Sequence, residues 1–101
     1  MTGPTLRKQV VITNPQGLHM RPATAFALLA GQFQSDVRVF NEDRCANGKS
    51  VLELFTLVAL PGAELTIEVS GPDAGDALAA LVEVINRPVE EPAEPPPAPG
   101  I

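Results

Sequence analysis

PGAELTIEVSGPDAGDALAALVEVI, residues 61–85, contains the clearest strand pattern and the clearest helix pattern of the chain. Leu65, Ile67 and Val69 alternate with polar residues, which predicts a strand with one buried face. Asp73 is a residue type that caps helices, and a helical pattern follows it. The apolar residues at helical spacing are Ala77, Leu78, Leu81, Val82 and Ile85. This stretch therefore predicts a half-buried strand followed by an amphipathic helix.

Toward the N-terminus the same two periodicities predict five more elements. We expect strands at residues 6–13, 36–41 and 44–47, a helix at residues 22–31 and a short helix at residues 51–57. Turn signals such as Asn14-Pro15-Gln16-Gly17 separate them. The order β-α-β-β-α-β-α, with four half-buried strands, predicts an α+β fold in which helices cover one face of an antiparallel sheet.

Composition excludes several classes of function. The chain has 101 residues, room for one small domain, and its 7 basic and 12 acidic side chains argue against nucleic-acid binding. The single cysteine, Cys45, and the single histidine, His19, exclude a disulfide framework and a cysteine- or histidine-rich metal site. No apolar run approaches the roughly 20 residues of a membrane span, and residues 1–8 lack a signal-peptide pattern. We therefore expect a cytoplasmic protein.

The composition changes sharply at Pro88. Residues 88–101 read PVEEPAEPPPAPGI, with six prolines and three glutamates in fourteen residues. Proline removes backbone donors and fixes φ, so this stretch cannot form a regular helix or sheet. We expect a domain at residues 1–87 and a disordered Pro/Glu-rich tail at residues 88–101, with a partner-binding polyproline segment as the alternative.

The segment GLHMRPA, residues 17–23, carries the candidate chemistry. His19 follows a glycine-containing turn and precedes a helix that starts near Pro22. The positive end of a helix favours a neutral imidazole and stabilises an anion attached to the ring. Arg21 adds a planar cation that suits phosphate oxygens. These residues are suited to holding a phosphoryl group on His19, whereas a lone histidine before a helix is more often a surface residue or a helix cap.

Three blocks together resemble the HPr family of histidine-containing phosphocarriers over about residues 5–87. They are GLHMRPA at residues 17–23, NGKS at residues 47–50 and PGAELTIEVSGPDA at residues 61–74. The resemblance implies an open-faced β-sandwich, four antiparallel strands covered on one face by three helices. It also implies that His19 accepts a phosphoryl group on Nδ1 from enzyme I and passes it to IIA-type proteins of a sugar phosphotransferase system. Arg21 would stabilise the phosphate.

The same resemblance implies a docking surface for both partners beside the histidine. The residues that it assigns to this surface are Met20, Val51, Leu52 and Phe55. For Phe55, a place in the core is the alternative. Leu28 stands where many members of the family carry polar or basic residues on the exposed face of the first helix.

Ser50 has two competing interpretations. It matches the serine that a dedicated HPr kinase/phosphorylase modifies in HPr proteins of some bacteria. Alternatively, Ser50 and Glu53 form a capping box, in which the hydroxyl and the carboxylate each satisfy a backbone donor.

The sequence is therefore compatible with three functions. The first is a phosphocarrier rather than a stand-alone enzyme, acting as a monomer without cofactor, metal, nucleic-acid partner or membrane insertion. The second is a regulatory protein that signals nutrient state through phosphorylation of His19, Ser50 or both. The third is an α+β binding module whose histidine is incidental. We interpret Cys45 as a small apolar strand residue with no chemical role.

Overall fold

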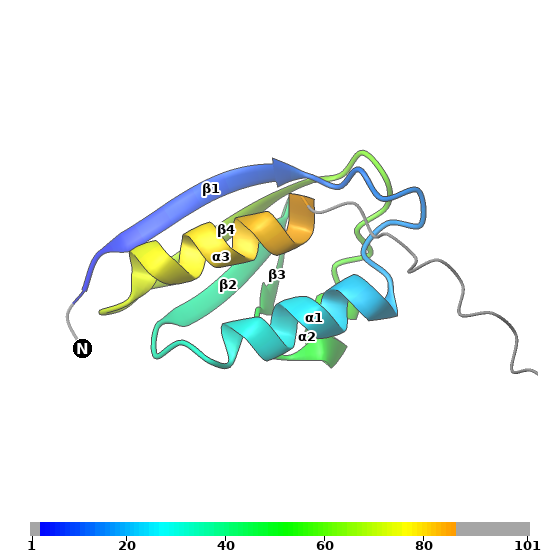
Figure 1. Cartoon of the computed structure of the whole chain (residues 1–101). Coiled ribbons are helices and arrows are strands. Elements are labelled where there is room, and N and C mark those ends of the chain that lie inside the picture. The colour runs from blue at the N-terminus through cyan, green and yellow to red at the C-terminus, as the bar shows by residue number, and fades with distance from the viewer. Residues whose placement is uncertain (1–2, 87–101) are drawn as a thin grey trace, which may run out of the picture.

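The computed structural model describes residues 3–86, which contain one antiparallel sheet of four strands and three helices (Figure 1). In chain order the elements are β1 (Thr5–Val11), α1 (Met20–Ala30), β2 (Asp36–Asn41), β3 (Arg44–Asn47), α2 (Val51–Phe55), β4 (Glu64–Ser70) and α3 (Ala74–Asn86). The strand order is β1-β4-β2-β3. The predicted α+β class and element order are confirmed. The tail predicted at residues 88–101 lies outside the described residues.

The last strand in sequence, β4, lies in the interior of the sheet. It pairs antiparallel with β1 on one side and with β2 on the other. Leu65, Ile67 and Val69 are fully buried, as their alternation predicts. On the opposite face Arg7 of β1 stands directly across from Glu68, and its Nε donates to the carboxylate at 2.7 Å. The sheet therefore has one apolar face and one polar face.

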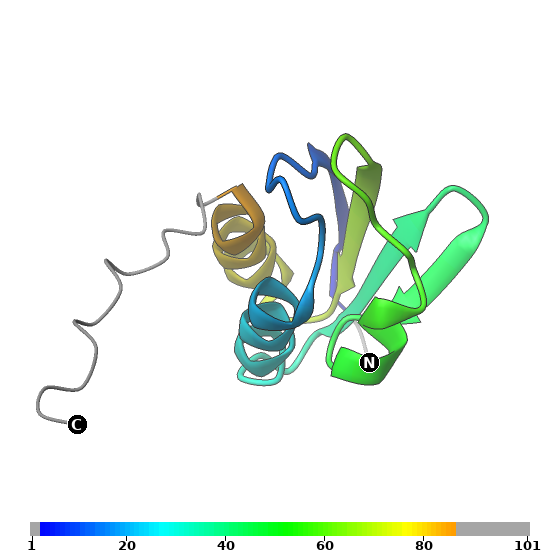
Figure 2. The ribbon, with the colours of Figure 1, turned by 90° about the vertical axis from the view of Figure 1, so that its right-hand side faces the viewer.

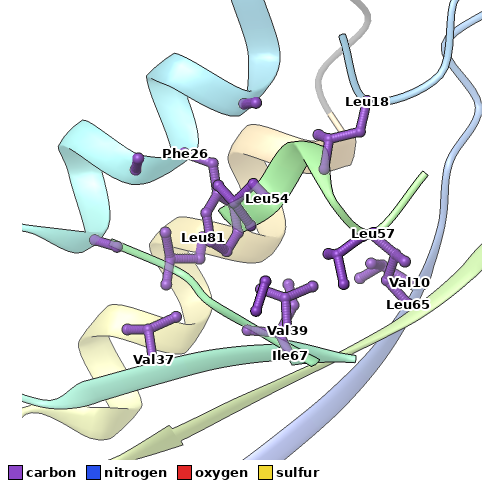
Figure 3. Packing of buried hydrophobic residues seen from close by; sticks show 14 of the residues in the cluster. Val10, Leu18, Phe26, Val37, Val39, Leu54, Leu57, Leu65, Ile67 and Leu81 are labelled. Atoms are coloured by element: carbon purple, nitrogen blue, oxygen red, sulfur yellow. The ribbon is translucent and has the colours of Figure 1, made fainter. Parts of the chain in front are cut away.

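The helices supply the other layer of the core. Figure 2 shows α1 and α3 side by side on one side of the sheet, and α2 packs against α1 and β3. Each helix contributes a large buried side chain, namely Phe26, Leu54 and Leu81 (Figure 3). They join one cluster with the buried residues of the sheet. The open-faced sandwich is thus held by a single apolar core.

Several element boundaries differ from prediction. The first strand covers Thr5–Val11 rather than residues 6–13. The first helix begins at Met20 rather than at Pro22, so that His19 becomes its N-cap residue. The short helix ends at Phe55 rather than at residue 57. Beyond it Val58 has φ 51°, a left-handed conformation that costs an L-residue about 1–2 kcal/mol. The chain turns away from the helix there, toward β4.

Asp73 ties the start of α3 to the loop before β2. Its Oδ2 accepts from the backbone amide of Gln34 at 2.9 Å, and its Oδ1 accepts from the amide of Ser35 at 3.0 Å and from the Ser35 hydroxyl. The hydrogen bond from the Ser35 side chain, followed by that from the Gln34 amide, lowers the pKa of Asp73 below its usual value. The carboxylate form therefore stabilises this junction.

We expect Asp73→Asn to change how stability depends on pH. A carboxyl whose pKa is lower in the folded state stabilises the fold above its unfolded pKa of about 3.9. That stability is lost as the pH falls through the lower, folded pKa. Thermal unfolding at a series of pH values from 6 downward should show a gap between the unchanged chain and Asp73→Asn that closes in acid.

The matched control is Asp76→Asn, which removes another carboxyl from the first turn of α3. Asp76→Asn should not reproduce the gap, because none of the hydrogen bonds from the Gln34 and Ser35 amides goes to Asp76. A gap for Asp73→Asn that stays constant from pH 6 to pH 2 would contradict the prediction.

Candidate functional site

The segment between β1 and α1 is fastened to the loop that precedes β4. The Ile12 amide donates to the Ala63 carbonyl at 2.9 Å, and the Gly62 amide donates to the Ile12 carbonyl at 2.7 Å. Farther along, the Leu18 amide donates to the Ala59 carbonyl at 2.9 Å. The Leu18 side chain enters the core (Figure 3). These contacts fix the backbone immediately before His19.

Gly17 makes the sharp turn into this site possible. Its φ is +74°, in the region that favours glycine. A Cβ at this position would lie 2.5 Å from the Ala59 carbonyl oxygen. The Gly17 carbonyl accepts from the His19 amide at 3.0 Å. Glycine therefore allows the close approach that orients residue 19.

His19 occupies the N-cap position of α1. Its backbone is extended, with φ −88° and ψ −169°, and its carbonyl accepts the Ala23 amide at 3.0 Å. Its side chain makes no capping hydrogen bond, so the ring does not serve as a helix cap. Instead, Nε2 lies 3.1 Å from Nδ2 of Asn14. The partly exposed ring thus stands at the positive end of α1.

Asn14 is the site residue that the sequence did not reveal as functional. The sequence indicates only a turn at this residue, and Asn14 does start that turn: its carbonyl accepts from the Gly17 amide at 2.8 Å. A polar side chain in a turn five residues before a lone histidine was the available signal. Only the path of the turn shows that the two side chains meet.

A shallow depression surrounds the histidine on the surface of α1. Its lining residues are His19, Met20, Arg21, Thr24, Ala25 and Leu28. Met20 and Leu28 are 65% and 67% exposed, which is unusual for large apolar side chains. Arg21 is exposed in the first turn of the helix. The structure thus gathers three of the predicted site residues, together with Leu28, on one face.

The capping box predicted at Ser50 is only half correct. The Ser50 hydroxyl accepts from the Glu53 amide at 3.2 Å, as a cap does. The Glu53 carboxylate, however, accepts from the Asn47 amide at 2.9 Å rather than from the amide of Ser50. The Ser50 amide already donates to the Asn47 carbonyl at 3.0 Å. Glu53 therefore closes the preceding turn instead of the box.

The apolar residues of α2 divide between surface and core. Leu52 is 78% exposed. Val51 and Phe55 are half-buried and pack against the core cluster. The helix that carries them packs against α1, which carries Met20. Cys45 is exposed on β3, so its interpretation as an apolar strand residue describes its chemistry and not its burial.

The chain matches the family model described as "PTS HPr component phosphorylation site" over residues 6–87. It is 38% identical over 81 residues to phosphocarrier protein HPr of Neisseria meningitidis, which covers 80% of this chain and 91% of the relative. It is 35% identical over 86 residues to phosphocarrier protein NPr of Shewanella violacea, covering 85% and 94%.

Solved structures agree with these sequence matches. HPr from Bacillus anthracis superposes with a TM-score of 0.76 at 31% identity, covering 80% of this chain and 96% of that one. Another similar structure, with a TM-score of 0.64 and 33% identity, is an HPr dimer from Thermoanaerobacter tengcongensis; it covers 75% of this chain and 87% of that one. The open-faced fold with a histidine ahead of α1 defines a small phosphocarrier domain. The chain belongs to the HPr family.

Among the helices of residues 3–86, none combines the length and the apolar character that crossing a membrane requires.

Proposed function

We propose that this chain accepts a phosphoryl group on Nδ1 of His19 from enzyme I, ultimately from phosphoenolpyruvate, and passes it to IIA-type proteins of a sugar phosphotransferase system. The observation that carries the proposal is the place of the ring. It is partly exposed at the N-terminus of α1, and its side chain is not used as a cap. A partner can reach such a ring, and the helix end stabilises the anion that the ring then carries.

Phosphoryl transfer requires little of this chain beyond a correctly placed histidine ring. The Nδ1 lone pair forms a bond to phosphorus while the bond from phosphorus to the donor atom breaks, and the donor keeps that electron pair. The charge of the bound phosphoryl group is met by the helix dipole and by the Arg21 guanidinium. No cofactor takes part, because the partners supply the donor and the acceptor.

The exposed apolar side chains around the histidine suit the docking of these partners. Met20 and Leu28 line the same depression as His19, and Leu52 stands exposed on α2. Val51 and Phe55 lie on the same helix as Leu52, half-buried against the core. We propose that a monomer in the cytoplasm presents this surface first to enzyme I and then to a IIA-type protein.

The direct test is incubation of the purified chain with phosphoenolpyruvate and enzyme I. HPr of Neisseria meningitidis serves as the positive control. We expect the mass of one phosphoryl group, bound in an acid-labile and alkali-stable form, and its transfer onward when a IIA-type protein is added. No incorporation under conditions that phosphorylate the control would contradict the proposal.

A regulatory role is the second candidate, and the observation behind it is the Ser50 hydroxyl at the N-terminus of α2. We expect Ser50→Asp to accept phosphoryl groups from enzyme I about as fast as the unchanged chain. The capping role explains Ser50 without a kinase, and a phosphate there would lie one turn from the Glu53 carboxylate. The initial rate of phosphorylation is the measurement.

Ser50→Ala separates the structural contribution of the hydroxyl. It should lower the free energy of unfolding by about 1 kcal/mol through loss of the cap. If instead Ser50→Asp slows phosphoryl acceptance strongly while Ser50→Ala does not, the charge itself blocks docking, and the regulatory role is supported.

A further inference from the structure

The side chain of Asn14 is fixed at its oxygen end. Oδ1 accepts from the backbone amide of Gln16 at 3.0 Å within the turn. A side-chain amide has its acceptor on oxygen and its donors on nitrogen, so this bond determines which way the group faces. Nδ2, the donor end, is therefore directed at Nε2 of His19, 3.1 Å away.

This contact determines which ring nitrogen of His19 has a free lone pair. Nδ2 can only donate, so Nε2 must accept, and the neutral ring must hold its proton on Nδ1. We propose that Asn14 is a positioning residue, which holds His19 with Nε2 bare and Nδ1 carrying its substituent. The inference rests on the proposed function, in which that substituent becomes the phosphoryl group.

The arrangement matches the phosphorylated ring. A neutral ring with phosphorus on Nδ1 has its remaining lone pair on Nε2, and this lone pair accepts from the same Asn14 amide. The hydrogen bond is thus the same with a proton or with a phosphoryl group on Nδ1. Neither ring nor amide has to turn once transfer is complete.

The attack itself needs the other neutral form for a moment. Nδ1 is a nucleophile only with its lone pair free. Water therefore takes the Nδ1 proton and delivers a proton to Nε2, and the hydrogen bond from Asn14 is lost. The Nδ1 lone pair then bonds to phosphorus, and the bond from phosphorus to the donor breaks with its electron pair left on the donor. Nε2 finally returns its proton to water and again accepts from Asn14.

Asn14 therefore protects the phosphorylated form. Protonation of Nε2 makes the ring a better leaving group, because it departs as neutral imidazole rather than as the imidazolate anion. An amide donor facing Nε2 opposes that protonation. The proposed effect is a longer life of the phosphohistidine between its two partners.

Asn14→Asp is the decisive variant. The carboxylate keeps an oxygen for the Gln16 amide, so the turn is preserved, but it presents an acceptor to Nε2 in place of a donor. Asn47→Asp is the matched control. Asn47 makes the same kind of turn, with Oδ1 accepting from the Lys49 amide at 2.9 Å, and its substitution adds the same charge three residues before Ser50 in sequence.

The first measurement needs no phosphorylation. Long-range ¹H–¹⁵N correlation spectra on the alkaline side of the ring's titration should show Nε2 bare and Nδ1 protonated in the unchanged chain and in Asn47→Asp. Asn14→Asp should reverse the two nitrogens. A protonated Nε2 in the unchanged chain, or an unchanged pattern in Asn14→Asp, would overturn the inference.

The second measurement is the half-life of the phosphorylated chain at pH 7, followed by ³¹P spectra after enzyme I is removed. Asn14→Asp should shorten it at least about tenfold, since hydrogen bonds to charged groups are worth that much or more. Asn47→Asp should leave it unchanged, and an equal half-life in Asn14→Asp would overturn the protective role. Failure of the unchanged chain to accept a phosphoryl group would instead contradict the proposed function. The spectra of the ring nitrogens would still test whether Asn14 determines the tautomer of His19.

Discussion

His19→Ala should accept no phosphoryl group from phosphoenolpyruvate and enzyme I, whereas the unchanged chain should gain one. Alanine offers no lone pair to phosphorus, and His19 is the only histidine of the chain. Mass spectra of the intact chain at neutral pH, taken over a time course, measure the effect. Residual labelling of His19→Ala at a rate near that of the unchanged chain would place the acceptor elsewhere.

The variant should remain folded, which makes its loss of function interpretable. The ring of His19 is partly exposed and, within residues 3–86, makes one side-chain hydrogen bond, to Asn14, so its removal should cost about 1 kcal/mol or less. Cys45→Ser is the matched control, because it removes the one exposed thiol and should leave labelling unchanged. Loss of labelling in Cys45→Ser would assign the phosphoryl group to sulfur.

The fold was predictable where burial imposes a period on the sequence. Leu65, Ile67 and Val69 alternate because one face of β4 meets the helices and the other faces outward. The ends of elements were less predictable. The sequence favours Pro22 as the start of α1, yet Pro22 is the third residue of the helix. Proline is tolerated there because the first few amides of a helix have no partner within it.

The site was predictable only as far as it is local. His19 and Arg21 were found because a helix N-terminus is visible in the sequence around them. The contact with Asn14 was not, since it depends on the turn through Gly17 and on backbone bonds to the distant loop at Ala59. The half-correct capping box has a different cause, because there a local turn competes with the box: the Asn47 carbonyl, three residues away, accepts the Ser50 amide.

The Val58 conformation shows another limit of predicting helix boundaries from sequence periodicity. The apolar spacing continues through Leu57, which is buried, so the sequence alone favours a longer helix. The strained backbone conformation at Val58 does not change the periodic pattern of apolar residues in the sequence. It is tolerated because the buried residues on either side, Leu57 and Ala59, fix the chain there.

Gly17→Ala should both destabilise the domain and disturb the histidine. The new Cβ would lie 2.5 Å from the Ala59 carbonyl oxygen, at a residue whose φ is +74°. Left-handed strain and a displaced Leu18–Ala59 hydrogen bond together predict a loss of about 2–4 kcal/mol. The melting temperature should fall by roughly 10 °C or more.

Gly75→Ala provides the matched comparison for this prediction. Gly75 lies in α3, a Cβ there would have nothing within 4 Å, and alanine is the better helix former by about 1 kcal/mol. It should therefore raise the melting temperature and leave phosphoryl acceptance unchanged. For Gly17→Ala, phosphorylation measured well below its melting temperature should also be slower, because the His19 amide donates to the Gly17 carbonyl and the ring moves with the turn. A Gly17→Ala chain that melts with the unchanged protein and accepts phosphoryl groups at the same rate would show that the turn does not position His19.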